Sequence, residues 1–198
     1  ECIMKKLYLF DFDGTLTYKD TMFLFLKYYD SKKYFWSYFK HIPVFILVKL
    51  KLMDAELAKK SFIASVLKGE REIKINRKVL AFFDEYYPKI IRESALDFFK
   101  NIDKNNTTFY LVSASLDIWV RPFAKKMGMT LIATEAQFVE GRFTGNFQTK
   151  NNNGEEKVKR IKQVIGDQKF DKIIAFGDTS GDKPMLAFAH ESHYRFFN

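Results

Sequence analysis

The chain has 198 residues, which fits one domain or one domain with an insertion, and its 47% hydrophobic residues, with 22 Phe and 10 Tyr, provide a sizeable core. A formal net charge of +9 favours acidic partners, namely phosphorylated substrates, an anionic membrane or nucleic acid. The single cysteine, Cys2, excludes an internal disulfide and fits a reducing compartment, and no uncharged run reaches the ~18 residues of a membrane span.

The first predicted element is a buried parallel strand over residues 7–10. Asp11 and Asp13 follow its end, and Gly14 opens a turn. Two unneutralised carboxylates repel each other and are costly to bury. A hard cation such as Mg²⁺ removes that cost, because it takes oxygen ligands from one or two carboxylates. An isolated Asp-x-Asp is also typical of a solvated acidic turn, so the other polar segments decide between these interpretations.

The next stretch, residues 20–87, has a helical pattern. Five helices are predicted, over residues 22–29, 34–39, 44–53, 55–67 and 75–86. Pro43 is predicted to open the third, Asp54 to cap the fourth and Gly69 to end it, and Pro88 to break the chain after the fifth.

Beyond Pro88 strands and helices alternate. Strands are predicted over residues 109–112, 131–133, 172–176 and 194–197, helices over 92–104, 117–127 and 155–165, and a hairpin over 137–147. This order predicts an α/β fold with a parallel sheet and helices on its faces. Residues 4–17 and 88–198 would form the core, and residues 18–87 an all-helical cap domain inserted after the first strand.

Three polar clusters are predicted at the carboxyl ends of strands, where ligands of open α/β sheets bind. The first contains Asp11 and Asp13. The second is Ser113-Ala114-Ser115, where a hydroxyl and backbone N–H groups at a helix start suit a phosphoryl oxygen. Capping of that helix by Ser113 or Ser115 is the alternative. Their convergence on one edge predicts one site.

The third cluster is Gly177–Asp182. Asp178 follows the carboxyl end of its predicted strand, as Asp11 follows the end of the first strand. Asp182 lies near the start of the next predicted helix, where Pro184 suits the first turn. A turn with an N-cap aspartate is the alternative. Phosphoryl transfer also needs a positive group. Lys157, near the start of its helix, is the candidate, with Lys159 second, and an ordinary solvated lysine is the alternative.

Together these residues resemble the haloacid dehalogenase-like phosphohydrolases. Residues 11–17 match the first motif of that family, Ser113 the second, Lys157 the third, and Asp178 with Asp182 the fourth. The segments 113–115, 141–145 and 177–186 resemble the phosphoserine phosphatase-like branch, which carries a helical cap after the first motif.

The resemblance implies a Rossmann-like core and a phosphatase mechanism. Asp11 would attack phosphorus and form an aspartyl phosphate, while Asp13 would protonate the leaving oxygen and then activate water. Mg²⁺ would bind the Asp11 carboxylate, the Asp13 backbone carbonyl and Asp178, with Asp182 supporting it through water or outer hydrogen bonds. Phosphoryl oxygens would be held by Ser113, Ala114 and Lys157.

The cap bears on the substrate. Phosphoserine phosphatases usually have a Glu after the first motif and a cap arginine to grip phosphoserine. Here Asp20 stands at the Glu position, residues 61–68 contain no arginine, and Arg71 fits poorly. We therefore expect a small phosphorylated metabolite or a phospholipid head group, with phosphoserine itself as an alternative.

The cap is also rich in apolar and basic residues. Between residues 27 and 53 six lysines (Lys27, Lys32, Lys33, Lys40, Lys49 and Lys51) accompany one acid, Asp30, and alternate with aromatic and aliphatic runs. A helix with lysines on one face and large apolar groups on the other can lie in a membrane interface. The insertion and the last strand resemble, more loosely, the phosphatidylglycerophosphatase C family. The alternative is that the aromatics fill the cap core and the lysines solvate its back.

The expected function is therefore that of a Mg²⁺-dependent phosphomonoesterase in the cytoplasm or at the inner face of the membrane. A non-catalytic binding protein on the same fold is one alternative. A nucleic-acid end phosphatase is another, ranked lower because the cap aromatics are apolar and clustered. Met4 has the features of a natural start, so residues 1–3 are expected to be an artificial addition.

Overall fold

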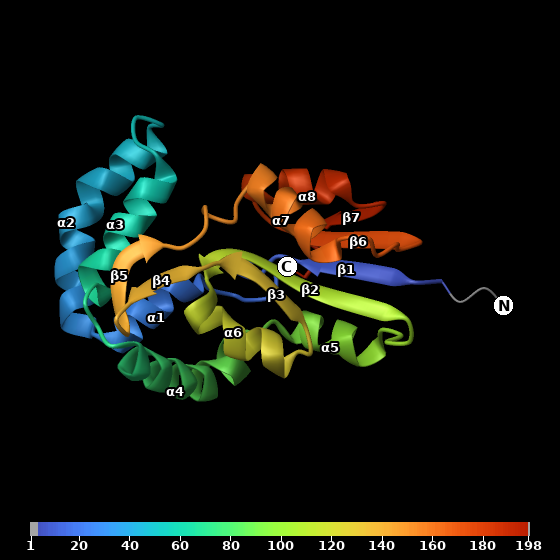
Figure 1. Ribbon diagram of the computed structural model, residues 1–198, viewed down its shortest axis with the longest axis horizontal. Helices are drawn as coiled ribbons and strands as arrows, with labels where there is room; N and C mark the ends of the chain where they lie inside the picture. Colours follow the sequence, from blue (N-terminus) through green and yellow to red (C-terminus); the bar gives the residue numbers. More distant parts are fainter. Residues whose placement is uncertain (1–3, 198) are drawn as a thin grey trace.

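A five-stranded parallel sheet forms the centre of the computed structural model, which describes residues 4–197 (Figure 1). Its strands are β1 (Lys6–Phe10), β2 (Thr107–Leu116), β3 (Thr130–Thr134), β6 (Lys172–Gly177) and β7 (Glu191–Tyr194), in the order β3-β2-β1-β6-β7. The predicted α/β class with a parallel sheet is confirmed. Because β1 lies between β2 and β6, the carboxyl ends of all three meet at one edge.

Helices cover both faces of the sheet (Figure 1). On one face lie α5 (Glu93–Asn101) and α6 (Asp117–Lys126); on the other lie α7 (Glu155–Ile165) and α8 (Lys183–Phe188), with a short 3₁₀ turn, Ser180–Asp182, before α8. Side chains alternate along β1, so Leu7 and Leu9 pack in the cluster that contains Ile161, whereas Phe10 packs on the opposite face. Both faces are therefore buried, as the continuous apolar run of this strand predicts.

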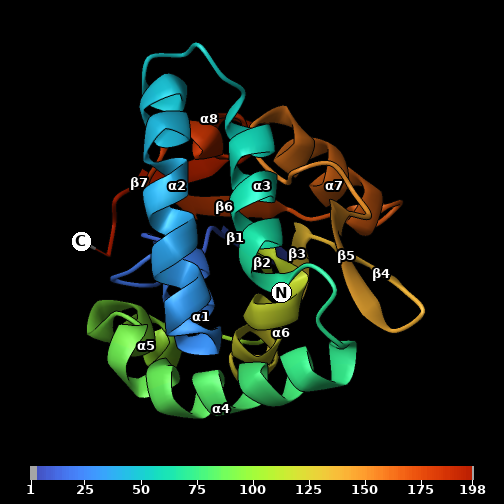
Figure 2. The ribbon, with the colours of Figure 1, turned by 90° about the vertical axis from the view of Figure 1, so that its left-hand side faces the viewer.

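Four helices form the cap between β1 and α5: α1 (Thr21–Tyr29), α2 (Ser31–Lys49), α3 (Ala55–Leu67) and α4 (Glu72–Ile90). Figure 2 shows α2 and α3 standing side by side. Phe62 of α3 is fully buried at their centre, with ring centroids 5.6 Å from Phe23 and 5.4 Å from Phe45. Such a cluster of rings stabilises the cap by burying large apolar area.

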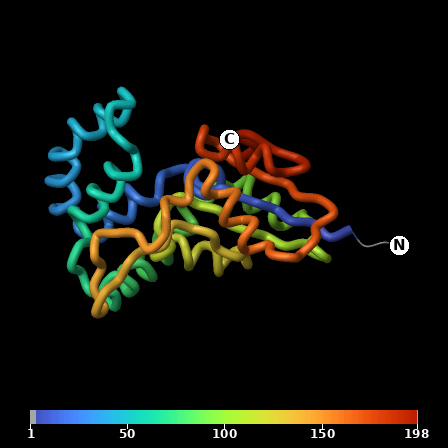
Figure 3. Tube along the Cα trace, turned by 45° about the horizontal axis from the view of Figure 1, so that its top comes forward, coloured from blue at the N-terminus to red at the C-terminus, as the bar shows by residue number. Residues whose placement is uncertain are grey.

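The hairpin β4 (Ala136–Val139) and β5 (Arg142–Phe147) leaves the core and lies beside the cap (Figure 3). The backbone N–H of Gly69 donates to the Phe143 carbonyl at 2.8 Å, and the Phe143 N–H donates to the Glu70 carbonyl at 3.0 Å. The hairpin thus fixes the end of α3 to the rest of the chain.

The predicted roles of two prolines were wrong: Pro43 does not open a helix, and Pro88 does not end one. The helices predicted over 34–39 and 44–53 are one helix, α2, which runs through Pro43, and α4 continues through Pro88 to Ile90. A proline inside a helix leaves the carbonyl four residues earlier without its donor. Here those carbonyls belong to Phe39 and Asp84, which are exposed, so water can serve them.

The last strand was also predicted too late. β7 ends at Tyr194, and Arg195, with φ 54°, turns the chain back. Phe197 is then buried against Phe176, with centroids 5.3 Å apart, so the aromatic end of the chain belongs to the core rather than to the sheet. The predicted addition at residues 1–3 lies outside the described residues. Among residues 4–197, none of the helices has the length and apolar character needed to cross a membrane.

Candidate active site

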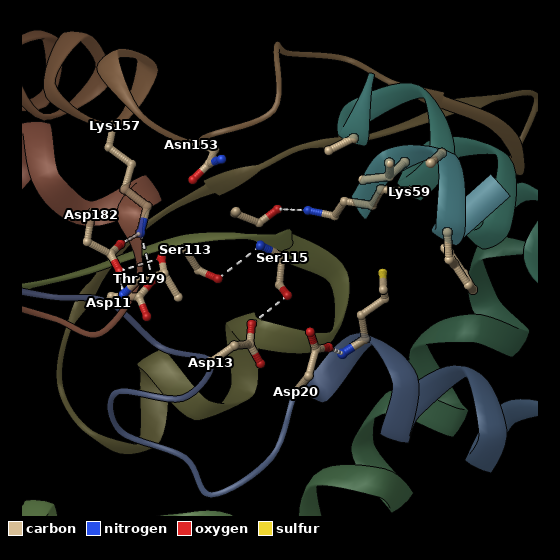
Figure 4. A pocket seen from close by; sticks show the side chains of 16 residues that line it. Asp11, Asp13, Asp20, Lys59, Ser113, Ser115, Asn153, Lys157, Thr179 and Asp182 are labelled. Carbon is tan, nitrogen blue, oxygen red and sulfur yellow. Dashed lines mark hydrogen bonds and ion pairs between the residues drawn. The ribbon is translucent and has the colours of Figure 1, made fainter. Parts of the chain in front are cut away.

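The three predicted polar clusters meet at the carboxyl ends of β1, β2 and β6 (Figure 4). A cavity of about 280 Å³ separates this edge from the cap. Its polar lining consists of Asp11, Asp13, Asp20, Lys59, Ser113, Ser115, Asn153, Lys157, Thr179 and Asp182. Side chains that are far apart in the sequence therefore line one cavity.

Lys157 and two carboxylates form the buried floor of the site. Lys157 Nζ lies 2.6 Å from Asp11 Oδ1 and 2.6 Å from Asp182 Oδ1, and only 1% of its side chain is exposed. Burial opposes the charge of Lys157, but the two carboxylates outweigh it and raise the pKa of this lysine. For Asp11, burial is the larger effect and raises the pKa to about 7. Lys157 is thus not the solvated lysine of the alternative interpretation.

Asp11 and Asp178 are joined by one hydroxyl. Thr15 Oγ1 lies 3.0 Å from Asp11 Oδ2 and 2.9 Å from Asp178 Oδ1. A hydroxyl has one proton, so it can donate to only one of these oxygens at a time. Burial raises the pKa of Asp178, although the hydrogen bond from Thr15 acts in the opposite direction.

This acidic group fits a hard cation. One carboxylate oxygen from each of Asp11, Asp178 and Asp182 lies within 4.8 Å of the others. Gly14 leaves space beside them: its φ is +87°, and a Cβ there would lie 2.5 Å from Asp178 Oδ2. Oxygen ligands of net negative charge are the set that Mg²⁺ prefers.

Asp13 faces away from this group, toward the cap (Figure 4). Its Oδ1 accepts hydrogen bonds from the N–H of Thr21 at 2.7 Å and from Thr21 Oγ1 at 2.6 Å, and its Oδ2 accepts from Ser115 Oγ at 2.6 Å. The two aspartates of the first motif therefore have different surroundings. Thr21 was not predicted as a site residue, because nothing in the sequence separates it from an ordinary helix-start threonine.

Ser113, Ala114 and Ser115 belong to β2, not to a helix start as predicted. The pairing of β2 with β3 is irregular between Ser113 and Leu116, and the N-cap of α6 is Leu116, without a side-chain hydrogen bond. Helix capping by either serine is therefore wrong. The irregular backbone turns the three residues toward the cavity, where Ser113 Oγ accepts from the N–H of Ser115 at 3.0 Å.

Asn152 is a supporting residue that the sequence did not reveal. Its Nδ2 donates to the carbonyls of Ser113 at 3.1 Å and Ile132 at 2.8 Å, and its side chain is fully buried. Because these bonds join the ends of two strands, Asn152 holds the Ser113 segment in place. It lies in a polar loop whose composition gives no sign of burial.

Asp182 organises the loop after β6. Its Oδ2 accepts from the backbone N–H of Asp178 at 3.1 Å and of Thr179 at 2.9 Å, while its Oδ1 contacts Lys157. Burial opposes this charge, but Lys157 and the Thr179 hydrogen bonds lower the pKa of Asp182. Asp182 stands at the N-cap position of α8, as in the alternative interpretation, but its side chain caps nothing there. It instead closes a capping box in which Thr179 is the N-cap.

The cap supplies the roof of the cavity. Its apolar part consists of Met22, Phe45, Val48, Ala55 and Ala58. Asp20 lines the cavity and also caps α1, because its Oδ1 accepts from the N–H of Met22 at 2.9 Å.

Lys59 of α3 reaches into this space from the cap. Its Nζ donates to the Ala114 carbonyl and, at 3.0 Å, to Asn151 Oδ1. Burial lowers the pKa of Lys59 to about 8, although Asp13 and Asp20 act in the opposite direction. Sequence reasoning missed Lys59, since only the fold separates it from its neighbour Lys60.

Comparison with known proteins agrees with this geometry. The family model described as haloacid dehalogenase-like hydrolase matches residues 8–187. The chain belongs to the haloacid dehalogenase-like hydrolases. Its resemblance to this family, inferred above from four motifs, is confirmed, and its activity is that of a hydrolase.

Relatives of this hydrolase are found by sequence and by structure. Protein CicA of Caulobacter vibrioides is 33% identical over 190 residues, covering 95% of this chain and 85% of CicA. A Bordetella pertussis protein of unknown function has a TM-score of 0.83 and 20% identity, covering 96% and 89% of the two chains. A substrate-bound phosphoserine phosphatase has a TM-score of 0.69 and 19% identity, covering 97% and 86%. The hydrolase thus has the fold of phosphoserine phosphatases.

Proposed function

We propose that this hydrolase is a Mg²⁺-dependent phosphomonoesterase that works through an aspartyl phosphate on Asp11. One observation carries the proposal: Asp11 is buried in contact with Lys157 and clusters with the carboxylates of Asp178 and Asp182, whereas Asp13 faces the cap. A nucleophile and a proton carrier need such different surroundings, because one must stay ionised and the other must exchange a proton.

The cation would be held by the carboxylates of Asp11 and Asp178 and by the backbone carbonyl of Asp13. Asp182, whose oxygens already accept from Lys157 and the Thr179 loop, would keep these ligands in place. When bound, Mg²⁺ would neutralise negative charge shared by Asp11 and the phosphoryl group.

The chain's own residues divide the reaction into two steps. First, an Asp11 oxygen forms a bond to phosphorus while the bond to the leaving oxygen breaks, and Asp13 gives its proton to that oxygen. Second, Asp13 takes a proton from water, the water oxygen bonds to phosphorus, and the bond to Asp11 breaks to release inorganic phosphate. Lys157, Ser113 and the Ala114 backbone would hold the phosphoryl oxygens through both steps.

The roof of the cavity bears on the substrate class. Five apolar side chains and one cation, Lys59, face the space where the leaving group would lie. This favours a small phosphorylated metabolite or phospholipid head group that carries a second anionic group within reach of Lys59. Phosphoserine is less favoured, because no arginine of residues 4–197 lines the cavity and Asp20 is engaged at the start of α1.

Turnover of p-nitrophenyl phosphate tests the proposal. We expect hydrolysis with Mg²⁺, loss of activity with EDTA, and loss in Asp11→Asn; equal rates in all three would refute it. A panel of phosphoserine, sugar phosphates, nucleotides and phosphatidylglycerophosphate would then identify the substrate class. A non-catalytic role is not favoured, since no motif position is missing and the family is one of hydrolases.

A further inference from the structure

The outward face of α2 is apolar although its side chains are exposed. Three side chains of this helix are buried against the cap, namely Tyr34, Ser37 and His41. The opposite side carries Trp36, Phe39, Pro43, Ile46 and Leu50, which recur every three or four residues and are all exposed; we call these five residues the outer stripe. Trp36 is 73% exposed and Phe39 65%. Large apolar side chains gathered in this way mark an interaction surface.

The stripe continues into the turn between α2 and α3, at the far end of the cap (Figures 1 and 2). Leu52 in this turn is 72% exposed. The sequence left open whether the apolar residues of this segment fill the cap core. In the structure these apolar residues fall into two groups: Phe45 packs on Phe62 in the cap core, whereas the residues of the outer stripe are exposed.

Lysines surround the stripe. Lys32, Lys40, Lys49 and Lys51 are exposed, and residues 31–53 contain no acidic residue. At 100° per residue, Lys40 and Lys49 fall on opposite flanks of the stripe. The acids at either end, Asp30 and Asp54, are occupied as the N-caps of α2 and α3. The surface is therefore both apolar and uncompensated in positive charge.

We propose that the outer stripe docks on a bilayer that contains anionic phospholipids, with α2 lying in the plane of the interface. An apolar face that enters the acyl boundary, flanked by lysines at head-group level, is the arrangement of interfacial helices. A second copy of the chain fits less well, because a twofold contact through the same surface would bring the lysines of both copies together.

Docking would bring the active site close to lipid head groups. The inner face of α2 supplies Phe45 and Val48 to the roof of the cavity, so only this helix, ~10 Å thick, lies between the stripe and the cavity. The docking proposal does not rest on the proposed phosphatase function, because no residue of the outer stripe lines the cavity.

Vesicle co-sedimentation tests the proposal, with phosphatidylcholine vesicles and the same vesicles containing phosphatidylglycerol. We expect binding to the anionic vesicles that weakens with added salt. Trp36 is a built-in reporter, because the only other tryptophan, Trp119, is fully buried. Its emission should shift to the blue on binding, and Trp36→Phe should bind without that shift.

Matched variants separate the stripe from general surface effects. Phe39→Ser/Ile46→Ser should lose most binding, whereas Ile73→Ser/Leu80→Ser on α4, which also changes exposed apolar residues, should keep it. Lys40→Ala/Lys49→Ala should weaken binding by about 25-fold, at about fivefold per lysine, and Lys159→Ala/Lys169→Ala on the core should change it little.

Turnover of p-nitrophenyl phosphate serves as the folding control and should stay unchanged in all these variants. Equal binding to neutral and anionic vesicles, no binding, or self-association that Phe39→Ser/Ile46→Ser abolishes would each overturn the proposal. Any of these results with turnover intact would leave the proposed phosphatase function standing. If the wild-type chain bound anionic vesicles but did not hydrolyse p-nitrophenyl phosphate, the docking proposal would stand and the proposed phosphatase function would fail.

Discussion

Lys157 Nζ lies 2.6 Å from Asp11 Oδ1, although the two residues are 146 positions apart in the chain. The contact exists because β1 delivers Asp11 and the first turn of α7 delivers Lys157 to the same edge of the sheet. Asp182 completes the arrangement from the other side, also at 2.6 Å. A buried cation between two carboxylates links the stability of the site to its chemistry.

Replacing Lys157 should therefore cost both stability and activity. Lys157→Met leaves Asp11 and Asp182 buried without their shared cation, and breaking a buried pair costs about 3–5 kcal/mol. Chemical denaturation should show this loss, together with loss of p-nitrophenyl phosphate turnover. Lys159→Met, on an exposed position of the same helix, is the control and should change stability by less than about 0.5 kcal/mol. Equal effects of the two substitutions would contradict the assignment of Lys157.

Mg²⁺ should stabilise the folded chain through Asp178. A ligand that binds only the folded state raises its melting temperature, and the stabilisation grows with the logarithm of the ligand concentration once this exceeds Kd. We expect a Mg²⁺-dependent rise for the wild-type chain, which EDTA reverses, and little rise for Asp178→Asn. Asp167→Asn, on an exposed residue away from the sheet edge, should respond like the wild type. A full Mg²⁺ response in Asp178→Asn would show that the cation binds elsewhere.

Gly14 should tolerate no side chain. Gly14→Ala places a Cβ 2.5 Å from Asp178 Oδ2 at a φ of +87°, so it adds a clash to about 1–3 kcal/mol of backbone strain. Gly128→Ala is the matched control, since its φ is +68° and nothing lies within 4 Å of the added atom. Both variants should lose stability, measured by denaturation, but only Gly14→Ala should lose its response to Mg²⁺.

Lys59 should make substrate affinity depend on pH. Burial lowers its pKa from 10.5 to about 8, so its charge is present below pH 8 and is lost as the pH rises above that value. KM for an anionic natural substrate should rise correspondingly above pH 8. Lys59→Met should raise KM at pH 7 by about 10- to 150-fold, from about 1.5–3 kcal/mol for a hydrogen bond to a charged group.

Two variants separate this role from a general effect of charge. Lys59→Arg keeps its charge at all accessible pH values, so KM should no longer rise above pH 8. Lys60→Met removes the adjacent lysine, which lies over the Phe147 ring, and should leave KM unchanged. An unaltered pH profile in Lys59→Arg would exclude Lys59 as the titrating group.

The sequence predicted the parts of the site that follow strand ends. Asp11, Ser113 and Asp178 each follow an apolar run of the kind typical of a buried strand. Parallel strands bring their carboxyl ends together. The α/β class follows from the same pattern. Lys157 was placed by its resemblance to a family motif, because its position near a helix start alone is ordinary.

The remaining residues depend on packing that local sequence does not encode. Lys59 reaches the cavity only because α3 lies over the sheet edge, and Asn152 is buried only because its loop crosses the ends of β2 and β3. The helix boundaries at Pro43 and Pro88 were predicted wrongly for a related reason. An exposed carbonyl can lose its hydrogen-bond donor at little cost when packing of the buried face stabilises the helix. The surface or core position of each α2 residue likewise follows from tertiary contacts.

Direct detection of a phosphate on Asp11 would test the proposed reaction most strictly. In Asp13→Asn, a substrate with a good leaving group such as p-nitrophenyl phosphate can still phosphorylate Asp11, because p-nitrophenolate departs without a proton, but water lacks its base. Acid quenching with Mg²⁺ present, followed by mass spectrometry of the peptides, should find phosphate on Asp11 in this variant and none in Asp11→Asn. Burst-free turnover with no phosphate on Asp11 at any time, or phosphate on another residue, would contradict it.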